Sequence, residues 1–575
     1  MRYLRAWARR SLRLPATRRV KLGALLGIAS TLSLVVVSGG AAGALGRSPQ
    51  VTSAARRLSV GATPAGTSQV AQAGNLLYAT SRGSNSRDGW YPSEPGLSPK
   101  VVGSPNFEQV FATQLNGQIY AQPLLVGRVV LVATETDWVY GLDPETGAIV
   151  WSRHLATAFR DKSLGCGDLL PSLGVTSTPT VDPATGVVYL VAQEYVAGKI
   201  AWFMHAVNPA TGAEMPHFPV MIKGPASNNP LQVFRYQQMQ RPGLLFLGGV
   251  VYAAFGTHCE IGPYSGVVVG VSTSGHETTM WTDQGKGTDS GGGIWQGGGG
   301  LTSDGPNQIL FASGNGYAPS SHPPVPTPGS SPPPNLADSV VRLVVQPNGS
   351  LKAKDFFSRY DDQVIDGHDW DLAGSPVALP SQFSTPQYPH LLVATGKEGI
   401  VYLLNRDSLG GAGEGPRHKD LALGEYQAGE AISSAGAWPG NGGYVYVSTD
   451  NGGANGGGQG HVDVYKFTVG SKGRPGLRLV GTGSQVTVFG VSGPLVTSDG
   501  TRPGSAVVWV VDGGNLQAYD PVPVNGKLTL IGTWPVGNPC SFAPPGIGEA
   551  MVYMGNQEGV LYGFGTKPSP AGRLS

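Results

Sequence analysis

The 575-residue sequence predicts an all-β fold, and three observations indicate an eight-bladed β-propeller, with seven blades as the alternative. Short runs rich in β-branched and aromatic residues recur in pairs that are separated by turns. The pairs follow one another at intervals of roughly 45 to 60 residues, as four-stranded blades with variable loops require. Glycine numbers 87 and charged residues are only 13%, which favours turn-rich β structure over a helical chain.

The clearest copy of the repeat is the segment 129–151. Residues 129–134 and 138–142 predict a hairpin, because both runs are rich in β-branched and aromatic side chains. The sequence DPETG at 143–147 then predicts a tight turn, in which the aspartate accepts backbone hydrogen bonds and the glycine takes a left-handed conformation. An outer strand follows at 148–151. One such sheet cannot bury both of its faces, so copies must lie beside it.

Seven further pairs repeat this pattern. They lie at 187–194 with 201–209, 250–256 with 266–272, 308–313 with 339–345, 391–395 with 400–405, 443–449 with 462–468, 506–512 with 516–520, and 550–555 with 560–564. The last copy has three strands and then stops at a Pro-rich tail. We expect residues 107–115 to supply its outer strand and close the ring, because closure removes an exposed sheet edge. The Pro-rich stretch 318–335 is expected to be a surface loop inserted in the fourth blade.

The first 46 residues predict a basic leader followed by a signal peptide or a transmembrane anchor. Eight Lys and Arg occur up to Lys21, and residues 22–46 carry no charge. The small residues at 42–44 suit cleavage, whereas about 25 uncharged residues also suffice to span a bilayer, so both fates stay open. Either fate places the rest of the chain outside the cytoplasm, as an exported protein that is secreted or anchored at the cell surface.

The remaining boundaries follow from composition. Residues 47–75 are small and polar and predict a flexible tether, 76–565 is the propeller, and 566–575 is a disordered tail. After residue 87 the chain holds 26 basic and 37 acidic side chains, so the overall charge of +2 comes from the leader. A mildly acidic body argues against nucleic acid as a partner.

Three cysteines, Cys166, Cys259 and Cys540, permit one disulfide. The pair Cys166–Cys259 is favoured because both residues lie at the ends of inner strands, and a set of buried unpaired thiols is the alternative. The sequence has no Cys-x-x-Cys motif and no phosphate-binding Gly-x-x-x-x-Gly-Lys-Ser/Thr motif, so nucleotide hydrolysis has no support.

The sequence LDPETGAIVW, the repeated hairpins and the segment 295–371 resemble the quinoprotein alcohol dehydrogenase type of propeller. This resemblance covers roughly residues 75 to 565, and members of that family use pyrroloquinoline quinone (PQQ) with calcium. The stretches NSRDGWYPSEPGLSP, GQIYAQPLLV, QRPGLLFLGGVVYAAFGTHCEIGPYSG and GKEGIVYLLNRDSLGG are more similar to exported propeller proteins of uncertain activity. The fold is therefore better supported than the activity.

The resemblance implies five candidate site residues. Trp295 in GGGIWQGGGG corresponds to the tryptophan beneath the quinone, and Lys397 in TGKEGIVYLLNR corresponds to a cationic residue that contacts the quinone carbonyls. Glu260 and Asn315 correspond to calcium ligands, and Asp338 to the base that takes the substrate hydroxyl proton. Four of the five lie in turns between the second and third strands of successive blades, and Trp295 lies in a connection between blades. These turns and connections open on one face of a propeller, so the five residues can meet there.

Each candidate also has a structural interpretation. Asn315 between two glycines suits a left-handed turn, and Glu260 and Lys397 suit solvated hairpin charges. Trp295 would then pack between blades, and Asp338 would cap a turn. The acidic cluster at 366–371 could hold a cation, although tying down a connection between blades is the favoured interpretation. Two departures from the dehydrogenases count against catalysis: this chain has no adjacent cysteine pair and no electron-accepting haem segment.

The sequence therefore predicts an extracytoplasmic propeller that acts as a binding or scaffold module for an unknown protein or small-molecule partner. The first alternative is a PQQ- and calcium-dependent dehydrogenase of alcohols or sugars. The second is a propeller that binds polysaccharide through exposed Trp and Tyr side chains.

Overall fold

The computed structural model describes residues 78–160, 165, 169–288, 290–317, 330–359, 367–412, 421–450 and 459–567. The predicted leader and tether, and residues 318–329 of the predicted surface loop, lie outside this range. No helix within the described ranges is long and apolar enough to cross a membrane.

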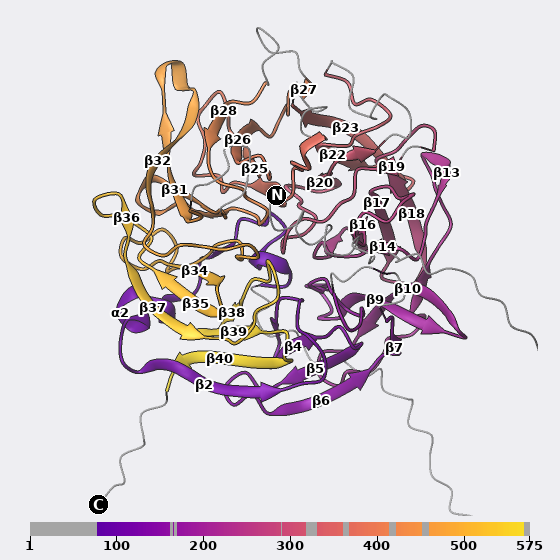
Figure 1. The fold of residues 1–575 in the computed structure, drawn as a ribbon, viewed down its shortest axis with the longest axis horizontal. Helices are drawn as coiled ribbons and strands as arrows, with labels where there is room; N and C mark the ends of the chain where they lie inside the picture. Colours follow the sequence, from indigo (N-terminus) through magenta and orange to yellow (C-terminus); the bar gives the residue numbers. More distant parts are fainter. Residues whose placement is uncertain are drawn as a thin grey trace, which may run out of the picture. The chain divides into compact units, whose positions relative to one another are not determined.

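Eight sheets are arranged around a central axis, so the described chain is an eight-bladed propeller, as the sequence predicts (Figure 1). The strands of blades one to four, from the inside outward, are β3 (Leu124–Val126), β4 (Val129–Ala133), β5 (Trp138–Leu142) and β6 (Ile149–His154); β8 (Thr180–Val181), β9 (Val188–Val196), β10 (Lys199–Val207) and β11 (Val220–Ile222); β15 (Leu245–Leu247), β16 (Val250–Thr257), β17 (Val267–Ser272) and β18 (Glu277–Thr282); and β20 (Gln308–Ala312), β22 (Ser339–Val345), β23 (Leu351–Ser358) and β27 (Gly411–Ala412). In blade four the innermost strand is reduced to the bridge between Thr302 and Leu310.

The other four blades follow the same order. Their strands are β24 (Val377–Ala378), β25 (Leu391–Thr395), β26 (Ile400–Asn405) and β28 (Gly424–Gln427); β29 (Gly436–Trp438), β30 (Tyr444–Ser448), β31 (Val462–Val469), β32 (Pro475–Gly483) and β36 (Lys527–Leu528); β1 (Trp90–Tyr91), β33 (Leu495–Thr497), β34 (Val507–Asp512), β35 (Asn515–Tyr519) and β37 (Leu530–Pro535); and β38 (Gly546–Gly548), β39 (Met551–Gly555), β40 (Val560–Thr566) and β2 (Phe107–Gln114). Two short strands add to the blades: β7 (Thr157–Ala158) pairs with β9 of blade two, and β14 (Gln238–Met239) pairs with β16 of blade three. Short elements outside the blades are β12 (Pro225–Ala226), β13 (Asn229–Val233), β19 (Ser290–Gly291), β21 (Gly316–Tyr317), α2 (Pro99–Val102), and the 3-10 turns at Ser81–Gly83, Pro95–Leu97, Gly440–Gly442 and Ser471–Gly473.

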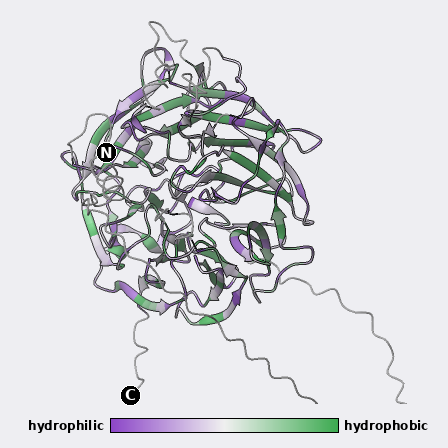
Figure 2. Cartoon of the chain, turned by 45° about the vertical axis from the view of Figure 1, so that its right-hand side comes forward, coloured by the Kyte–Doolittle hydropathy of each residue, from purple (hydrophilic) through white to green (hydrophobic). Residues whose placement is uncertain are grey.

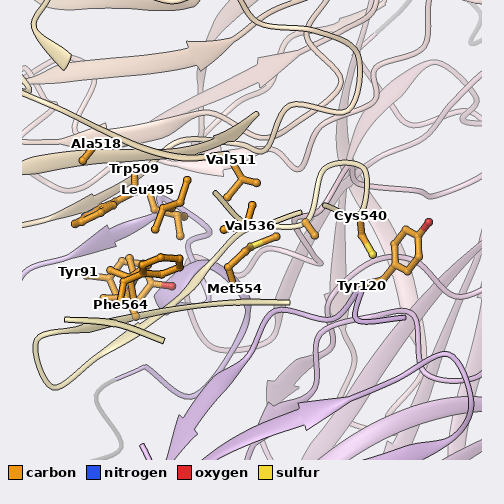
Figure 3. Packing of buried hydrophobic residues seen from close by; sticks show 14 of the residues in the cluster. Tyr91, Tyr120, Leu495, Trp509, Val511, Ala518, Val536, Cys540, Met554 and Phe564 are labelled. Atoms are coloured by element: carbon orange, nitrogen blue, oxygen red, sulfur yellow. The ribbon is translucent and has the colours of Figure 1, made fainter. Parts of the chain in front are cut away.

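The middle strands of the blades are continuous apolar runs because both of their faces pack against neighbouring blades. Every residue of β4 and of β34 is buried, whereas the outer strand β6 is exposed or half-buried throughout. Figure 2 shows hydrophobic residues concentrated along the strands. Figure 3 shows one layer between blades, where Leu495 and Trp509 of blade seven share a core with Phe564 of blade eight.

The ring closes through the N-terminal strand, which confirms the predicted closure. Strand β2 pairs antiparallel with β40, from Phe107 opposite Thr566 to Gln114 opposite Val560 (Figure 1). Blade eight therefore joins the two ends of the propeller domain, and β2 covers the sheet edge that β40 would otherwise expose.

Residues 78–94, which we call the central segment, connect the blades to one another near the axis. Its hydrogen bonds reach Gln122, Val181, Leu244, Leu301, Ala378, Ala435, Val496 and Ala550, one residue in or beside each blade. The innermost strands of a propeller converge on the axis, so a segment placed there can satisfy backbone groups of all the blades at once.

Two buried arginines carry much of this connection. Arg82 is 1% exposed, and its guanidinium donates to the carbonyl oxygens of Arg87, Ala435 and Pro494 at 3.1, 2.6 and 2.9 Å. Arg87 is fully buried and donates, among others, to the carbonyl of Leu244 at 2.8 Å. Burial lowers the pKa of Arg87 to about 9, with the charge of Arg82 acting in the same direction. Backbone carbonyls thus replace the water that these cations lose.

Candidate functional site

Trp295 lies in the connection from β19 to β20, and its ring is half-buried. The indole Nε1 donates to the carbonyl of Thr257 at 3.1 Å, and Tyr264 packs edge-on against the ring with centroids 6.2 Å apart. One hydrogen bond and one aromatic neighbour therefore fix the plane of the indole.

Three glycines hold the same ring. A Cβ atom added at Gly256, Gly293 or Gly314 would lie within 3.0 Å of the indole, which real Cβ atoms do not approach. The glycines come from three different places in the chain, so the backbone can close around Trp295 only if each site lacks a side chain.

Next to the ring is a polar group of four residues, Asn315, Asp369, Asp371 and Lys397, which we call the Lys397 cluster. The backbone N–H of Asn315 donates to Asp371 Oδ1 at 2.7 Å, and its side-chain Nδ2 donates to Asp369 Oδ1 at 3.0 Å. Lys397 Nζ forms ion pairs with Asp369 Oδ1 at 3.1 Å and with Asp371. A Cβ at Gly314 would touch both the indole and Asp371 Oδ1, so the cluster directly adjoins the Trp295 ring.

The charges of the cluster are partly matched. Burial alone would lower the pKa of Lys397, but Asp371 and Asp369 outweigh it, so the pKa is raised and the amine stays protonated. Burial raises the pKa of Asp369 against the opposing effect of Lys397, and the charge of Asp371 adds to the rise. The Asp369 side chain is 49% exposed, so Asp369 is the carboxylate of the Lys397 cluster that faces solvent. Asn315 Oδ1 is buried and has no hydrogen-bond partner in the described part of the chain.

Three of the five predicted residues, Trp295, Asn315 and Lys397, therefore lie together. Asp338 lies below the surface: it is 0% exposed, has a left-handed φ of 46°, and its N–H donates to the carbonyl of Gly314 at 2.9 Å. Glu260 is exposed, with a φ of 52°, in the turn after β16, and no hydrogen bond joins it to Asn315.

The bonding state of two of the three cysteines tests part of the disulfide prediction. Cys259 is disulfide-bonded, and Cys540 is a buried free thiol. The alternative in which all three thiols are unpaired is therefore wrong. Cys166, the predicted partner of Cys259, lies outside the described residues.

One feature of the site was not assigned from the sequence, namely the pairing of two aspartates with Lys397. The acidic cluster at 366–371 does tie down a connection, since Asp371 accepts from the Asn315 backbone, but Asp369 and Asp371 also bind Lys397. The alternating sequence His368-Asp369-Trp370-Asp371 was the available signal, and in the structure His368 stacks on Trp370 with ring centroids 4.4 Å apart.

No protein-family model and no curated protein matches the sequence. Several solved structures are similar in fold. The quinohemoprotein alcohol dehydrogenase ADHIIG from Pseudomonas putida HK5 matches with a TM-score of 0.56 and 14% identity, over 87% of this chain and 82% of that chain. The quinohemoprotein alcohol dehydrogenase from Comamonas testosteroni gives 0.54 and 15%, over 88% and 82%. A europium-containing methanol dehydrogenase gives 0.50 and 15%, over 85% and 98%.

These likenesses agree with the resemblance found in the sequence. The chain is an all-β, eight-bladed propeller of the kind found in quinoprotein alcohol dehydrogenases. At this level of identity the similarity concerns the fold alone.

Proposed function

We propose that the protein is an extracytoplasmic propeller that binds a planar ligand over Trp295, as a binding or scaffold module. One observation carries this proposal: the half-buried indole of Trp295 is held by three glycines and lies beside a polar cluster from neighbouring blades. The buried Trp438 adjoins one such glycine and Trp151 two, whereas Trp295 combines three with a neighbouring polar cluster, as a stacking surface for a flat ring does. The basic leader and uncharged stretch support the extracytoplasmic location.

Binding of PQQ, used as a planar probe, tests this proposal. Calorimetric titration is expected to give a measurable Kd for the intact chain, and Trp295→Leu is expected to weaken binding at least tenfold, or about 1.4 kcal/mol, because the stacking surface is lost. Trp534→Phe, which changes a tryptophan on the outer strand β37, is the matched control and should bind as the unmodified protein does. Equal affinity of the Trp295 and Trp534 variants would contradict the proposal.

A second candidate, the quinone-dependent dehydrogenase, is favoured by one atom, Asn315 Oδ1. A buried amide oxygen without a partner among the described residues suits a hard cation, and Asp369 is the nearest carboxylate with an exposed face. A bound quinone would supply the electron acceptor, and calcium would polarise its carbonyl. The residues that would hold the two groups are Asn315 for the cation and Trp295 for the ring. Asp338 is too deeply buried to reach a substrate, so the base in this candidate is Asp369.

Replacement of Asp369 by Asn separates the two candidates. In the presence of PQQ and calcium, a dehydrogenase should lose roughly two to four orders of magnitude in turnover of a primary alcohol, because the proton acceptor is gone. The melting temperature should change little, since Asn can still accept the hydrogen bond from Asn315. Glu425→Gln, an exposed carboxylate on β28, serves as the control. If the unmodified protein binds PQQ but turns over no alcohol or sugar, the dehydrogenase candidate is rejected and the proposal of a binding module stands.

A further inference from the structure

The seam between blades one and two contains a row of charged side chains that lies outside the candidate ligand site. Strand β6 of blade one packs there against the turn that follows β10 of blade two (Figure 1). Trp151 Nε1 donates to the carbonyl of Pro209 at 2.8 Å, and a Cβ atom added at Gly212 would lie 2.5 Å from the indole. Two residues further along β6, Arg153 forms an ion pair with Glu214 at 3.2 Å. An aromatic contact and an ion pair therefore join the two blades.

His205, on β10, extends this ion pair into the interior. Its ring is 2% exposed, with Nδ1 3.1 Å from Glu214 Oε2 and Nε2 2.7 Å from Glu194 Oε1 on β9. Glu194 is itself 3% exposed, and Glu214 Oε1 also accepts from the N–H of Ala206 at 3.1 Å. The imidazole thus has a carboxylate on each of its two nitrogens.

These two contacts need a proton that a neutral imidazole lacks. A neutral ring has one N–H and one lone pair, so it can donate to only one of the two carboxylates, whereas the imidazolium donates to both. Burial alone would lower the pKa of His205, but the hydrogen bonds and charges of Glu194 and Glu214 outweigh it, so the pKa is raised. The geometry and the charges therefore both favour the imidazolium.

Asp137, in the turn between β4 and β5 of blade one, lies at the inner end of this row. It is 0% exposed, and neither carboxyl oxygen has a hydrogen-bond partner within the described ranges. Burial raises the pKa of Asp137 well above its usual range, and the charges of Glu194 and Glu135 add to the rise. Asp137 is therefore uncharged while Glu194 is ionised. The complete row, which we call the His205 row, is Arg153, Glu214, His205, Glu194 and Asp137.

We propose that the His205 row is a pH-sensitive junction between blades one and two, which is tight while His205 is an imidazolium and loosens at alkaline pH. Loss of the proton leaves a ring lone pair facing a carboxylate, and ionisation of Asp137 places a second negative charge near Glu194. Strand β7 is the element most directly affected, because it pairs with β9 at Glu194. This inference goes beyond the proposed function and does not depend on a bound ligand.

Both titrations change stability in the same direction. The pKa of His205 in the folded protein lies above the value of about 6.5 in the unfolded chain, so its contribution is complete below about pH 6.5 and is lost as the pH rises through the raised pKa. Folded Asp137 keeps its proton where the unfolded carboxyl has lost it, so it costs more stability from about pH 4 upward until its own pKa is passed. At the proposed extracytoplasmic location the junction would respond to the pH of the surroundings.

Urea unfolding of the full chain at about pH 6.5 and about pH 9.5 tests the junction. His205→Gln should lower the unfolding free energy at the lower pH, and the loss in the folding equilibrium constant should be at least about tenfold greater there than at the higher pH. The reason is that glutamine has no charge to lose. Deuterium exchange at the imidazole C2 position, which reports the titration of each histidine, should give His205 a midpoint above about 6.5. Glu214→Gln should lower this midpoint, because it removes a charge that stabilises the imidazolium.

His390→Gln is the matched control. His390 Nδ1 lies 2.9 Å from Asp407, but the two side chains are 49% and 50% exposed, so solvent screens the pair and the substitution should have little effect at either pH. A His205→Gln effect of the same size at both pH values would assign His205 a structural role and reject the junction. If that variant does not fold, the midpoints decide: a His205 midpoint at or below about 6.5, or one that Glu214→Gln leaves unchanged, overturns the inference.

Discussion

Deletion of residues 105–119 is expected to abolish the cooperative unfolding transition, whereas deletion of residues 47–75 should leave the melting temperature unchanged. The first deletion removes β2 and its ladder with β40, and with it the buried side chains of Phe107 and Phe111. Burial of each phenylalanine stabilises the fold by roughly 1.5 to 3 kcal/mol, and the edge of β40 would become exposed. The combined loss approaches the whole stability of an ordinary domain, about 5 to 15 kcal/mol. Differential scanning calorimetry of the two truncations measures the contrast.

A point substitution tests the same closure without shortening the chain. Phe107→Ala should destabilise by about 3 to 5 kcal/mol, because Phe107 packs against Trp509 and Trp534 at 5.9 and 5.2 Å across the junction of blades seven and eight. Glu108→Ala on the same strand is the control, since its side chain points away from the core and pairs at the surface with Lys567. Two truncations of equal thermal stability, or equal effects of the two point variants, would reject closure through β2.

Replacement of Arg82 by Met is expected to destabilise the propeller by at least about 3 kcal/mol, the largest effect that we expect from a single polar side chain. Methionine fills a similar volume but leaves the carbonyls of Arg87, Ala435 and Pro494 buried without their donor. Each unsatisfied buried carbonyl costs about 1 to 3 kcal/mol. Because Ala435 and Pro494 lie at the entrances to blades six and seven, the loss acts on the connection between blades. The midpoint of urea unfolding measures the effect.

Arg502→Met is the control for this experiment. Arg502 is 75% exposed and pairs with Asp499 at 3.2 Å, and such surface pairs contribute roughly 0 to 1 kcal/mol. If Arg82→Met and Arg502→Met unfold at the same urea concentration, the central segment does not join the blades in the way described.

The number of blades, the outer strand from residue 107 and the turn that follows residue 142 were predictable from the sequence. Each rests on local information: β-branched runs at regular intervals, turn residues such as Asp143 and Gly147, and a last copy that lacks one strand. In the structure Asp143 Oδ1 accepts from the N–H of Thr146 at 2.8 Å and Gly147 has a φ of 69°, as these residue types favour. Closure followed from counting strands, because an open propeller would leave a sheet edge unpaired.

The composition of the site depends on the tertiary structure. Spacing placed Glu260, Asn315, Asp338 and Lys397 in turns on one face, but it does not encode which way each side chain points. Glu260 and Asp338 have left-handed backbone conformations, which place the first at the surface and the second beneath Gly314. The charges that Lys397 binds, Asp369 and Asp371, come from a connection outside those turns.

The burial of the central segment likewise depends on the tertiary structure and could not be predicted from the sequence. In the sequence Arg82 and Arg87 are ordinary charges in a polar stretch, and charge predicts exposure. They are buried because eight inner strands converge on one axis and present carbonyl groups there, and only the closed ring creates that set of acceptors. Repeats along the chain determine the blades. The arginine side chains and the backbone carbonyls that meet at the axis come from residues up to hundreds of positions apart, so their contacts exist only once the ring is complete.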